Sequence, residues 1–157
     1  MQLLLMRHGE AVEERVDIRR PLSDQGLADV KMMARFLKQG RFPIMNFFHS
    51  TKERARQTAD IVRQAVNPAA VLVEKNYLAP MDTLDQGIKQ IGQLTVDTLI
   101  VGHMPFLSNL VSWLVTGEET KEIVSFPAGA VVVLTPSSAG RWVITTAVSP
   151  AHLSGKG

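Results

Sequence analysis

Near the start of the chain stands the stretch Leu3-Leu4-Leu5-Met6-Arg7-His8-Gly9. Its apolar part predicts a buried β-strand over residues 2–6, and Gly9 permits a sharp turn as the chain leaves that strand. Arg7 and His8 would then lie at the carboxyl end of a strand, which is where open α/β sheets bind their ligands. A permanent cation beside a base or nucleophile that works near neutral pH indicates phosphate chemistry.

The composition is typical of a soluble globular protein of one domain. The chain has 157 residues, 45% of them hydrophobic and 20% charged, which is enough for a substantial core. Cysteine is absent, which excludes disulfides and fits a reducing compartment, so we expect a cytoplasmic protein. The net charge of +2 gives no indication of nucleic-acid binding. No apolar stretch is long enough for a membrane span or a signal peptide, so no membrane partner is expected.

Strand and helix signals alternate along the rest of the chain. Strands are expected over residues 2–6, 44–48, 71–73, 98–101, 130–135 and 141–148, and helices over 23–39, 50–66, 84–91 and 105–114. Ser23 is a candidate N-cap, and the continuously apolar strand at 98–101 is expected to be central. The last two strands form a hairpin. This order predicts a three-layer α/β/α domain over residues 1–157, whose mainly parallel sheet has antiparallel edge strands.

Three segments of this sheet are expected to meet at its carboxyl edge. Arg7 and His8 follow the first strand, Arg54 lies in the first turns of the helix after the second strand, and His103 follows the fourth strand. Two arginines and two histidines can surround a phosphoryl group, because the planar guanidinium matches phosphate oxygens. The N-termini of two helices at this edge would add favourable dipole ends.

Four motifs in a fixed order extend this pattern over nearly the whole chain. They are Met6-Arg7-His8-Gly9, Arg20-Pro21-Leu22 with Gly26, Ser50 with Arg54-Ala55-Arg56-Gln57-Thr58-Ala59, and Val101-Gly102-His103-Met104-Pro105. Together they resemble the histidine phosphatase superfamily, also called the phosphoglycerate mutase-like family. Within it, the chain looks most similar to the small bacterial SixA-type phosphohistidine phosphatases.

The resemblance implies roles for the matching residues. His8 would be the nucleophile, and Arg7, Arg54 and His103 would hold the non-bridging oxygens and the charge that develops during transfer. The candidate phosphate-binding residues are Arg7, Gly9, Arg20, Arg54 and His103. Neither a metal nor another cofactor is implied, because the cations are already built into the chain. One ring nitrogen of His8 must be unprotonated to attack, and the other would donate to a backbone carbonyl and fix the tautomer.

Other basic side chains leave alternatives open. Arg54 and Arg56 lie two positions apart on a helix, so their side chains point in different directions; the family pattern selects Arg54. Arg20 could equally steer phosphate or bind a carboxylate of its own loop. Lys52 is expected to be a surface charge. The two remaining histidines, His49 and His152, are expected to be structural.

The sequence has no clear general acid. Family members that cleave phosphate esters often carry a carboxylate shortly after the third strand, whereas here none stands between Glu74 and Asp82. Asp82 or Glu10 would be the substitutes. A missing acid favours a leaving group such as imidazole, whose pKa is near ~6.5. The short connections also indicate an open pocket, which favours a phosphate carried on a protein surface.

These observations predict a metal-independent phosphatase with a phosphohistidine intermediate. The expected substrate is phosphohistidine on a signalling or phosphocarrier protein, such as a histidine phosphotransfer domain. Two alternatives stay open. One is a phosphomonoesterase of small metabolites or nucleotides. The other is a non-catalytic phosphate-binding module, which would keep the arginines but would have no reason to keep both His8 and His103.

Overall fold

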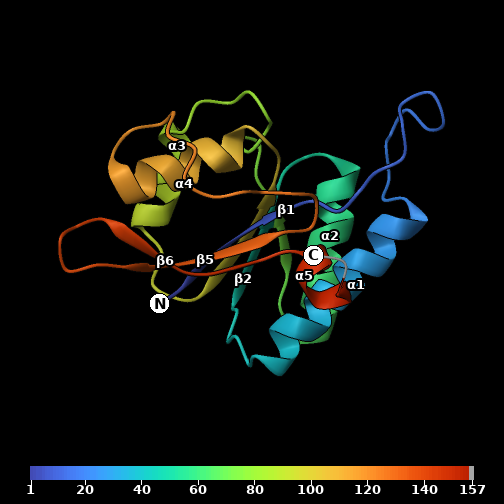
Figure 1. The fold of residues 1–157 in the computed structure, drawn as a ribbon, viewed down its shortest axis with the longest axis horizontal. Helices are drawn as coiled ribbons and strands as arrows, with labels where there is room; N and C mark the ends of the chain where they lie inside the picture. Colours follow the sequence, from blue (N-terminus) through green and yellow to red (C-terminus); the bar gives the residue numbers. More distant parts are fainter. Residues whose placement is uncertain (156–157) are drawn as a thin grey trace.

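In the computed structural model, which describes residues 1–155, a six-stranded sheet carries helices on both of its faces (Figure 1). The strands are β1 (Leu3–Arg7), β2 (Asn46–His49), β3 (Leu72–Glu74), β4 (Thr98–Gly102), β5 (Val131–Pro136) and β6 (Trp142–Val148). The helices are α1 (Asp24–Gln39), α2 (Glu53–Val66), α3 (Asp85–Gly92), α4 (Phe106–Thr116) and α5 (Pro150–Ser154). The last two residues of the predicted domain, 156 and 157, lie outside the described residues.

The strand order is β3-β2-β4-β1-β5-β6, and the first four strands of the chain are parallel. β4 pairs with both β1 and β2, and all five of its residues are buried, so the prediction of a central strand at 98–101 is confirmed. β5 runs antiparallel to β1, and β6 antiparallel to β5. The carboxyl ends of β1, β2 and β4 therefore lie side by side at one edge.

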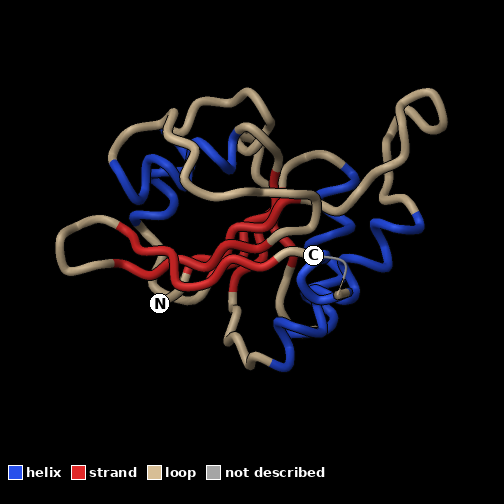
Figure 2. The backbone as a smooth tube through the Cα atoms, in the orientation of Figure 1, coloured by secondary structure: helices blue, strands red, loops and turns tan. Residues whose placement is uncertain are grey.

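The sheet is the middle of three layers, as predicted. Helices α3 and α4 cover one face, and α1, α2 and α5 cover the other (Figures 1 and 2). β1 shows why both faces need a cover: Leu3 and Leu5 pack toward the first helix layer, whereas Leu4 and Met6 pack toward the second. Alternate side chains of a strand point to opposite faces, so an uninterrupted apolar strand is stable only between two layers.

Helix α1 begins and ends close to its predicted bounds. Ser23 is the N-cap, and its side-chain oxygen accepts a hydrogen bond from the Gly26 amide at 3.0 Å. This bond satisfies one of the amides that a helix start leaves without a partner. The buried side of the helix carries the predicted stripe of Val30, Met33, Ala34 and Leu37. Helix and sheet thus share one apolar interface.

The second helix starts later than the sequence indicated. We expected α2 to begin at Ser50 or Thr51, but it begins at Glu53. The reason lies in the neighbouring strand, because the Ser50 amide still bonds to the Val101 carbonyl at 3.2 Å. Lys52 is also extended, with φ −80° and ψ 141°. The chain therefore stays bonded to β4 as far as Ser50, and the helix begins three residues later.

Two smaller differences lie near the other helices. Pro105 occupies the N-cap of α4 and does not lie within its first turn. Helix α5 was not predicted, because five residues are too few for an apolar stripe. It is held by a capping box, in which Ser149 and His152 bond to one another's backbone amides.

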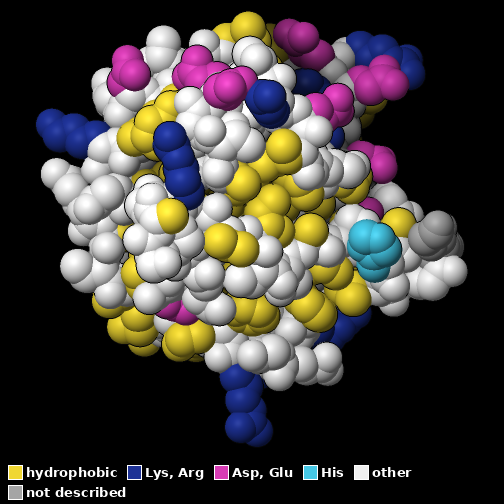
Figure 3. Space-filling model, turned by 60° about the vertical axis from the view of Figure 1, so that its left-hand side comes forward, with side chains coloured by type: hydrophobic (Ala, Val, Ile, Leu, Met, Phe, Trp, Pro, Cys, Tyr) yellow, Lys and Arg dark blue, Asp and Glu magenta, His cyan; other side chains and the backbone are white. Residues whose placement is uncertain are grey.

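The surface contains apolar as well as charged regions. Figure 3 shows one face of the molecule on which hydrophobic side chains gather, with charged side chains mostly toward the margin. Within the described residues, no helix is long and apolar enough to cross a membrane.

Candidate active site

Strand pairing brings the predicted site residues together at the carboxyl edge of the sheet. Arg7 is in register with Gly102, which precedes His103, and the His8 amide donates to the Gly102 carbonyl at 3.1 Å. The imidazole rings of His8 and His103 lie with their centroids 4.9 Å apart. Arg54 reaches the same place from the first turn of α2, and its Nε lies 3.4 Å from Nε2 of His8.

The ring of His8 is held in a single tautomer. Its Nδ1 lies 2.7 Å from the Gly9 carbonyl oxygen, and because a carbonyl only accepts, Nδ1 must carry a hydrogen. Burial lowers the pKa of His8 to about 4, and three nearby arginines contribute in the same direction against the raising effect of the Gly9 bond. The ring is therefore neutral at pH 7, and the electron pair of its Nε2 accepts a hydrogen bond from Arg54 Nε.

The turn after His8 is fixed by α2. The Gly9 amide donates to the Thr58 hydroxyl at 3.1 Å, and that hydroxyl donates to the Arg54 carbonyl at 2.8 Å. Gly9 was predicted to bind phosphate, but this bond leaves it no free N–H for a phosphoryl oxygen. A Cβ at Gly9 would lie 2.6 Å from Val30 Cγ2, so the position has no room for a side chain. Gly9 and Thr58 thus set the geometry of the loop.

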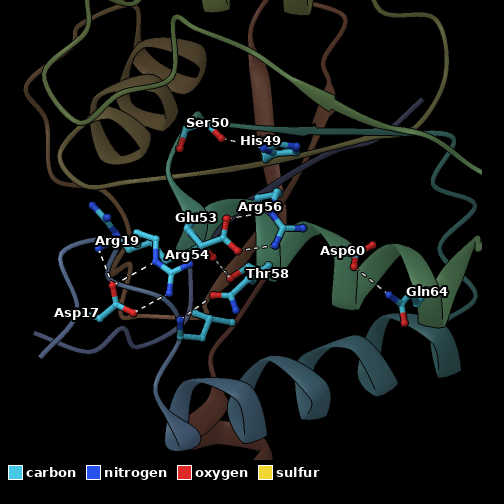
Figure 4. A network of polar contacts seen from close by, with 12 residues as sticks. Asp17, Arg19, His49, Ser50, Glu53, Arg54, Arg56, Thr58, Asp60 and Gln64 are labelled. Atoms are coloured by element: carbon cyan, nitrogen blue, oxygen red, sulfur yellow. Dashed lines mark hydrogen bonds and ion pairs between the residues drawn. The ribbon is translucent and has the colours of Figure 1, made fainter.

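Arg54 and Arg56 of α2 diverge, as the two-residue spacing indicated. Arg54 points toward His8. The guanidinium of Arg56 instead pairs with Glu53 on the helix surface, with Nε 3.0 Å from a carboxylate oxygen (Figure 4). Burial lowers the pKa of Arg54, but a guanidinium remains protonated in proteins. The glutamate raises the pKa of Arg56. Of the two charges, only that of Arg54 is directed at the candidate nucleophile.

His103 is almost fully buried, with 1% of its surface exposed. Its Nε2 lies 2.6 Å from the Ser50 hydroxyl. Burial lowers the pKa of His103 to about 3, and the positive charge of neighbouring groups, His8 first, acts in the same direction. Its Nδ1 is buried and has no hydrogen-bond partner among the described residues.

Arg7 also has an unused polar atom. One terminal nitrogen donates to the Phe126 carbonyl at 3.0 Å, but Nε is buried without a partner among residues 1–155. Burial lowers the pKa of Arg7. A buried polar group without a partner costs about 1–3 kcal/mol. An anion that bonds to Arg7 Nε and His103 Nδ1 would remove this cost, so the site is suited to bind phosphate.

Arg20 lies close enough for its charge to lower the pKa of both His8 and Arg54. The sequence allowed Arg20 either to steer phosphate or to bind a carboxylate of its own loop. Among the described residues, Arg20 forms no ion pair with a carboxylate. Its Nε donates instead to the Val12 carbonyl at 3.1 Å. Its backbone is left-handed, with φ 48°, so the loop adopts an unfavourable conformation to place this cation.

The remaining candidates are bonded elsewhere. Glu10 accepts a hydrogen bond from the Ser23 hydroxyl at 3.0 Å, and Asp82 accepts one from the Ala79 amide at 2.8 Å. His49 is buried and donates from Nδ1 to the Ser50 carbonyl at 2.8 Å. His152 caps α5. Both of these histidines therefore have structural contacts, as predicted.

Sequence reasoning gave no role to two polar residues of the site. Ser50 and Thr58 belong to the quoted motifs, but their contacts with His103 and Gly9 join residues about fifty positions apart. One feature of the sequence could have indicated a role for Ser50: its hydroxyl follows a predicted strand, at the edge of the sheet that carries the histidines. Nothing local in the sequence indicates which histidine it contacts.

The model of the histidine phosphatase superfamily (branch 1) matches residues 3–82, which include Arg7, His8 and Arg54. The chain belongs to the histidine phosphatase superfamily. Phosphohistidine phosphatase SixA of Escherichia coli K12 is 27% identical to it, over 98% of this chain and 96% of the relative. The matched region thus covers the segments that carry Arg7, His8 and Arg54, whereas His103 lies beyond its end.

Solved structures of the superfamily have the same fold. The protein histidine phosphatase SixA in complex with tungstate superimposes with a TM-score of 0.82 at 27% identity, over 98% of this chain and 99% of that one. Phosphoglycerate mutase from Bacillus anthracis str. Sterne superimposes with a TM-score of 0.70 at 14% identity, over 99% and 96%. The fold is therefore phosphoglycerate mutase-like, and the chain is a SixA-like member of the histidine phosphatase superfamily.

Proposed function

We propose that this protein is a phosphatase that removes phosphate from phosphohistidine on a signalling or phosphocarrier protein, through a phosphohistidine intermediate on His8. One observation carries the proposal. Nδ1 of His8 is bonded to the Gly9 carbonyl, which leaves Nε2 without a hydrogen and with its electron pair directed at Arg54. The similarity to SixA over nearly the whole chain supports the same activity.

In the first step, Nε2 of His8 attacks the phosphorus atom in line with the bond to the substrate imidazole. A P–N bond forms on His8 as the P–N bond of the substrate breaks. The substrate imidazole leaves as a neutral molecule when its other nitrogen carries a proton, so no general acid is needed. Arg7, Arg54 and His103 bind the three equatorial oxygens and stabilise their charge.

In the second step, water attacks the phosphorus atom and His8 is the leaving group. His8 retains its Nδ1 hydrogen throughout, because the Gly9 carbonyl holds it. The ring therefore departs as neutral imidazole and recovers the Nε2 electron pair with which it started. The proton of the attacking water leaves with inorganic phosphate, so the same tautomer serves both halves of the reaction.

The proposal also covers the need for metal, the domain organisation and the partners of the protein. The transferred charge is met by arginine and histidine side chains, so the mechanism is independent of metal. Residues 1–157 would form one catalytic domain that works in the cytoplasm on a protein substrate, and neither nucleic acid nor membrane takes part.

Turnover of three substrate classes under one buffer condition tests the proposal. We expect kcat/KM to be highest for a phosphohistidine protein, intermediate for an activated aryl phosphate and low for phosphoserine or a sugar phosphate, because only the first two leave readily without an acid. Equal turnover of an alkyl phosphate would favour a phosphomonoesterase, with Asp82 and Glu10 the first acids to mutate. Phosphate binding without any turnover would favour a non-catalytic module.

A further inference from the structure

A groove beside the candidate active site has no role in the chemistry proposed above. It lies between the loop of residues 12–21 and the start of α2. Its walls are formed by Glu14, Ile18, Arg19, Arg20, Thr51, Lys52, Glu53 and Arg54. Arg54, which lines the groove, lies with its Nε 3.4 Å from Nε2 of His8, so the groove borders the candidate active site. A substrate larger than phosphate would extend into it.

The loop of residues 12–21 forms a fixed wall of this groove. It stands out from the body of the molecule (Figures 1 and 2). Its base is closed by a β-bridge between Ala11 and Leu22 and by a bond from the Val12 amide to the Pro21 carbonyl at 2.9 Å. Nearer the tip, the Arg20 amide donates to the Asp17 carbonyl at 2.9 Å. These bonds hold the loop in one shape, which suits a docking surface.

The opposite wall carries a lysine in an electrostatically unfavourable position. Lys52 is the N-cap of α2, where a side chain such as serine or aspartate would normally accept a helix amide, and its side chain makes no capping bond. A cation at a helix N-terminus is also disfavoured by the helix dipole. Lys52 is exposed and has no carboxylate partner among residues 1–155. It therefore contributes little to the fold and leaves a positive charge available at the groove.

The groove as a whole has an excess of unpaired positive charge. Arg19 pairs with Asp17, and Glu53 pairs with Arg56 (Figure 4). Apart from these ion-paired side chains, the lining carries three positive charges, on Lys52, Arg20 and Arg54. Glu14 is the one unpaired carboxylate of the described lining. The groove therefore favours an acidic ligand.

The same loop exposes two large apolar side chains next to the groove. Ile18, which lines it, is 80% exposed, and Val16 is 68% exposed. Neither supports the core of the domain. Covering them with an apolar side chain of a partner would remove this surface from water.

We infer that this groove docks the phosphohistidine-bearing protein, through a segment that carries acidic side chains and an apolar side chain beside the phosphohistidine. The inference rests on the proposed function and adds the chemistry by which the substrate is recognised. The acidic side chains contact the cations of the α2 wall, and the apolar side chain packs on Ile18. Charge at the rim of such an interface acts mainly on association, and salt weakens it.

The test uses three phosphohistidine peptides of equal length, with glutamate, serine or lysine residues beside the phosphohistidine. For the wild-type protein at low salt, we expect the highest kcat/KM for the glutamate peptide and the lowest for the lysine peptide. Lys52→Ser should lower the glutamate-to-lysine ratio by about threefold or more. The ratio cancels any change in the chemical step. Lys31→Ser, which removes an exposed lysine in the middle of α1, is the matched control and should keep the wild-type ratio.

A second pair of peptides tests the apolar contact, with leucine or serine in one flanking position. The leucine peptide should be preferred by the wild-type protein, and Ile18→Ser should remove that preference.

The outcomes separate the two proposals. If the wild-type protein hydrolyses all the peptides equally well, or if Lys52→Ser keeps the wild-type ratio, the docking site is overturned and the proposed function stands. If the wild-type protein hydrolyses an aryl phosphate but no phosphohistidine peptide, the proposed function fails, and the docking site fails with it.

Discussion

At the scale of single residues, the site depends on which nitrogen of His8 carries the hydrogen. We expect His8→Ala to abolish turnover and to change the Kd for tungstate by less than about tenfold, because the charged groups that bind an oxyanion remain. An acid-labile phosphoenzyme should be trapped with the wild-type protein and be absent from the variant. His152→Ala removes a histidine that only caps α5 and should keep full turnover. Substantial activity of pure His8→Ala would refute the role of His8.

The same residue makes stability depend on pH. Burial lowers the pKa of His8 to about 4, whereas an unfolded histidine has a pKa near ~6.5. Between these values the unfolded chain binds more protons than the folded one, so stability is complete above the unfolded value and is lost as the pH falls toward 4. We therefore expect the urea midpoint to fall between pH 7 and pH 5, and to fall less in His8→Ala. Equal losses in both proteins would contradict this prediction.

At the scale of elements, helix α2 separates two arginines that the sequence places only two positions apart. Arg54→Ala should lower kcat/KM by on the order of 10²-fold or more, as the loss of a preorganised charge does. Arg56→Ala should have a small effect, because its guanidinium is engaged with Glu53 on the helix surface. The two variants are measured with one aryl phosphate, and circular dichroism checks that both are folded. Similar losses in the two variants would contradict the orientation of the helix.

The start of α2 allows a prediction about stability. Lys52→Ser introduces a hydroxyl that can accept an amide of the first helical turn, such as that of Arg54, so we expect the free energy of unfolding to rise by about 1 kcal/mol. Lys52→Ala removes the same charge without adding a cap and separates the two effects. Urea unfolding of the three proteins measures the difference. If the serine variant is no more stable than the alanine variant, the hydroxyl does not cap the helix.

At the scale of the whole molecule, the site exists only when β1, α2 and β4 are packed together. An oxyanion that bridges them binds the folded chain and not the unfolded one, so tungstate at about 100 times its Kd should add about 2.7 kcal/mol to the free energy of unfolding. Because the binding charges belong to side chains, the increase should be the same with and without EDTA. Arg54→Ala should show a smaller increase at the same concentration. A gain that disappears with EDTA would show that a metal takes part.

Much of this architecture could be predicted from local patterns. The apolar runs, the Ser23 cap and the alternation of strands and helices are set by residues that are close together in the sequence. The expectation that Arg7, Arg54 and His103 share one edge of the sheet follows from that alternation. Other features required the folded chain, because they join residues far apart in the sequence. Pairing with β4 delays the start of α2, Ser50 meets His103, and Thr58 takes the Gly9 amide. Burial makes both site histidines neutral. The motif indicated the chemistry and the bond from His8 to a backbone carbonyl. It could not indicate the contacts between distant segments, because these depend on distances and dielectric surroundings that arise only when the layers pack.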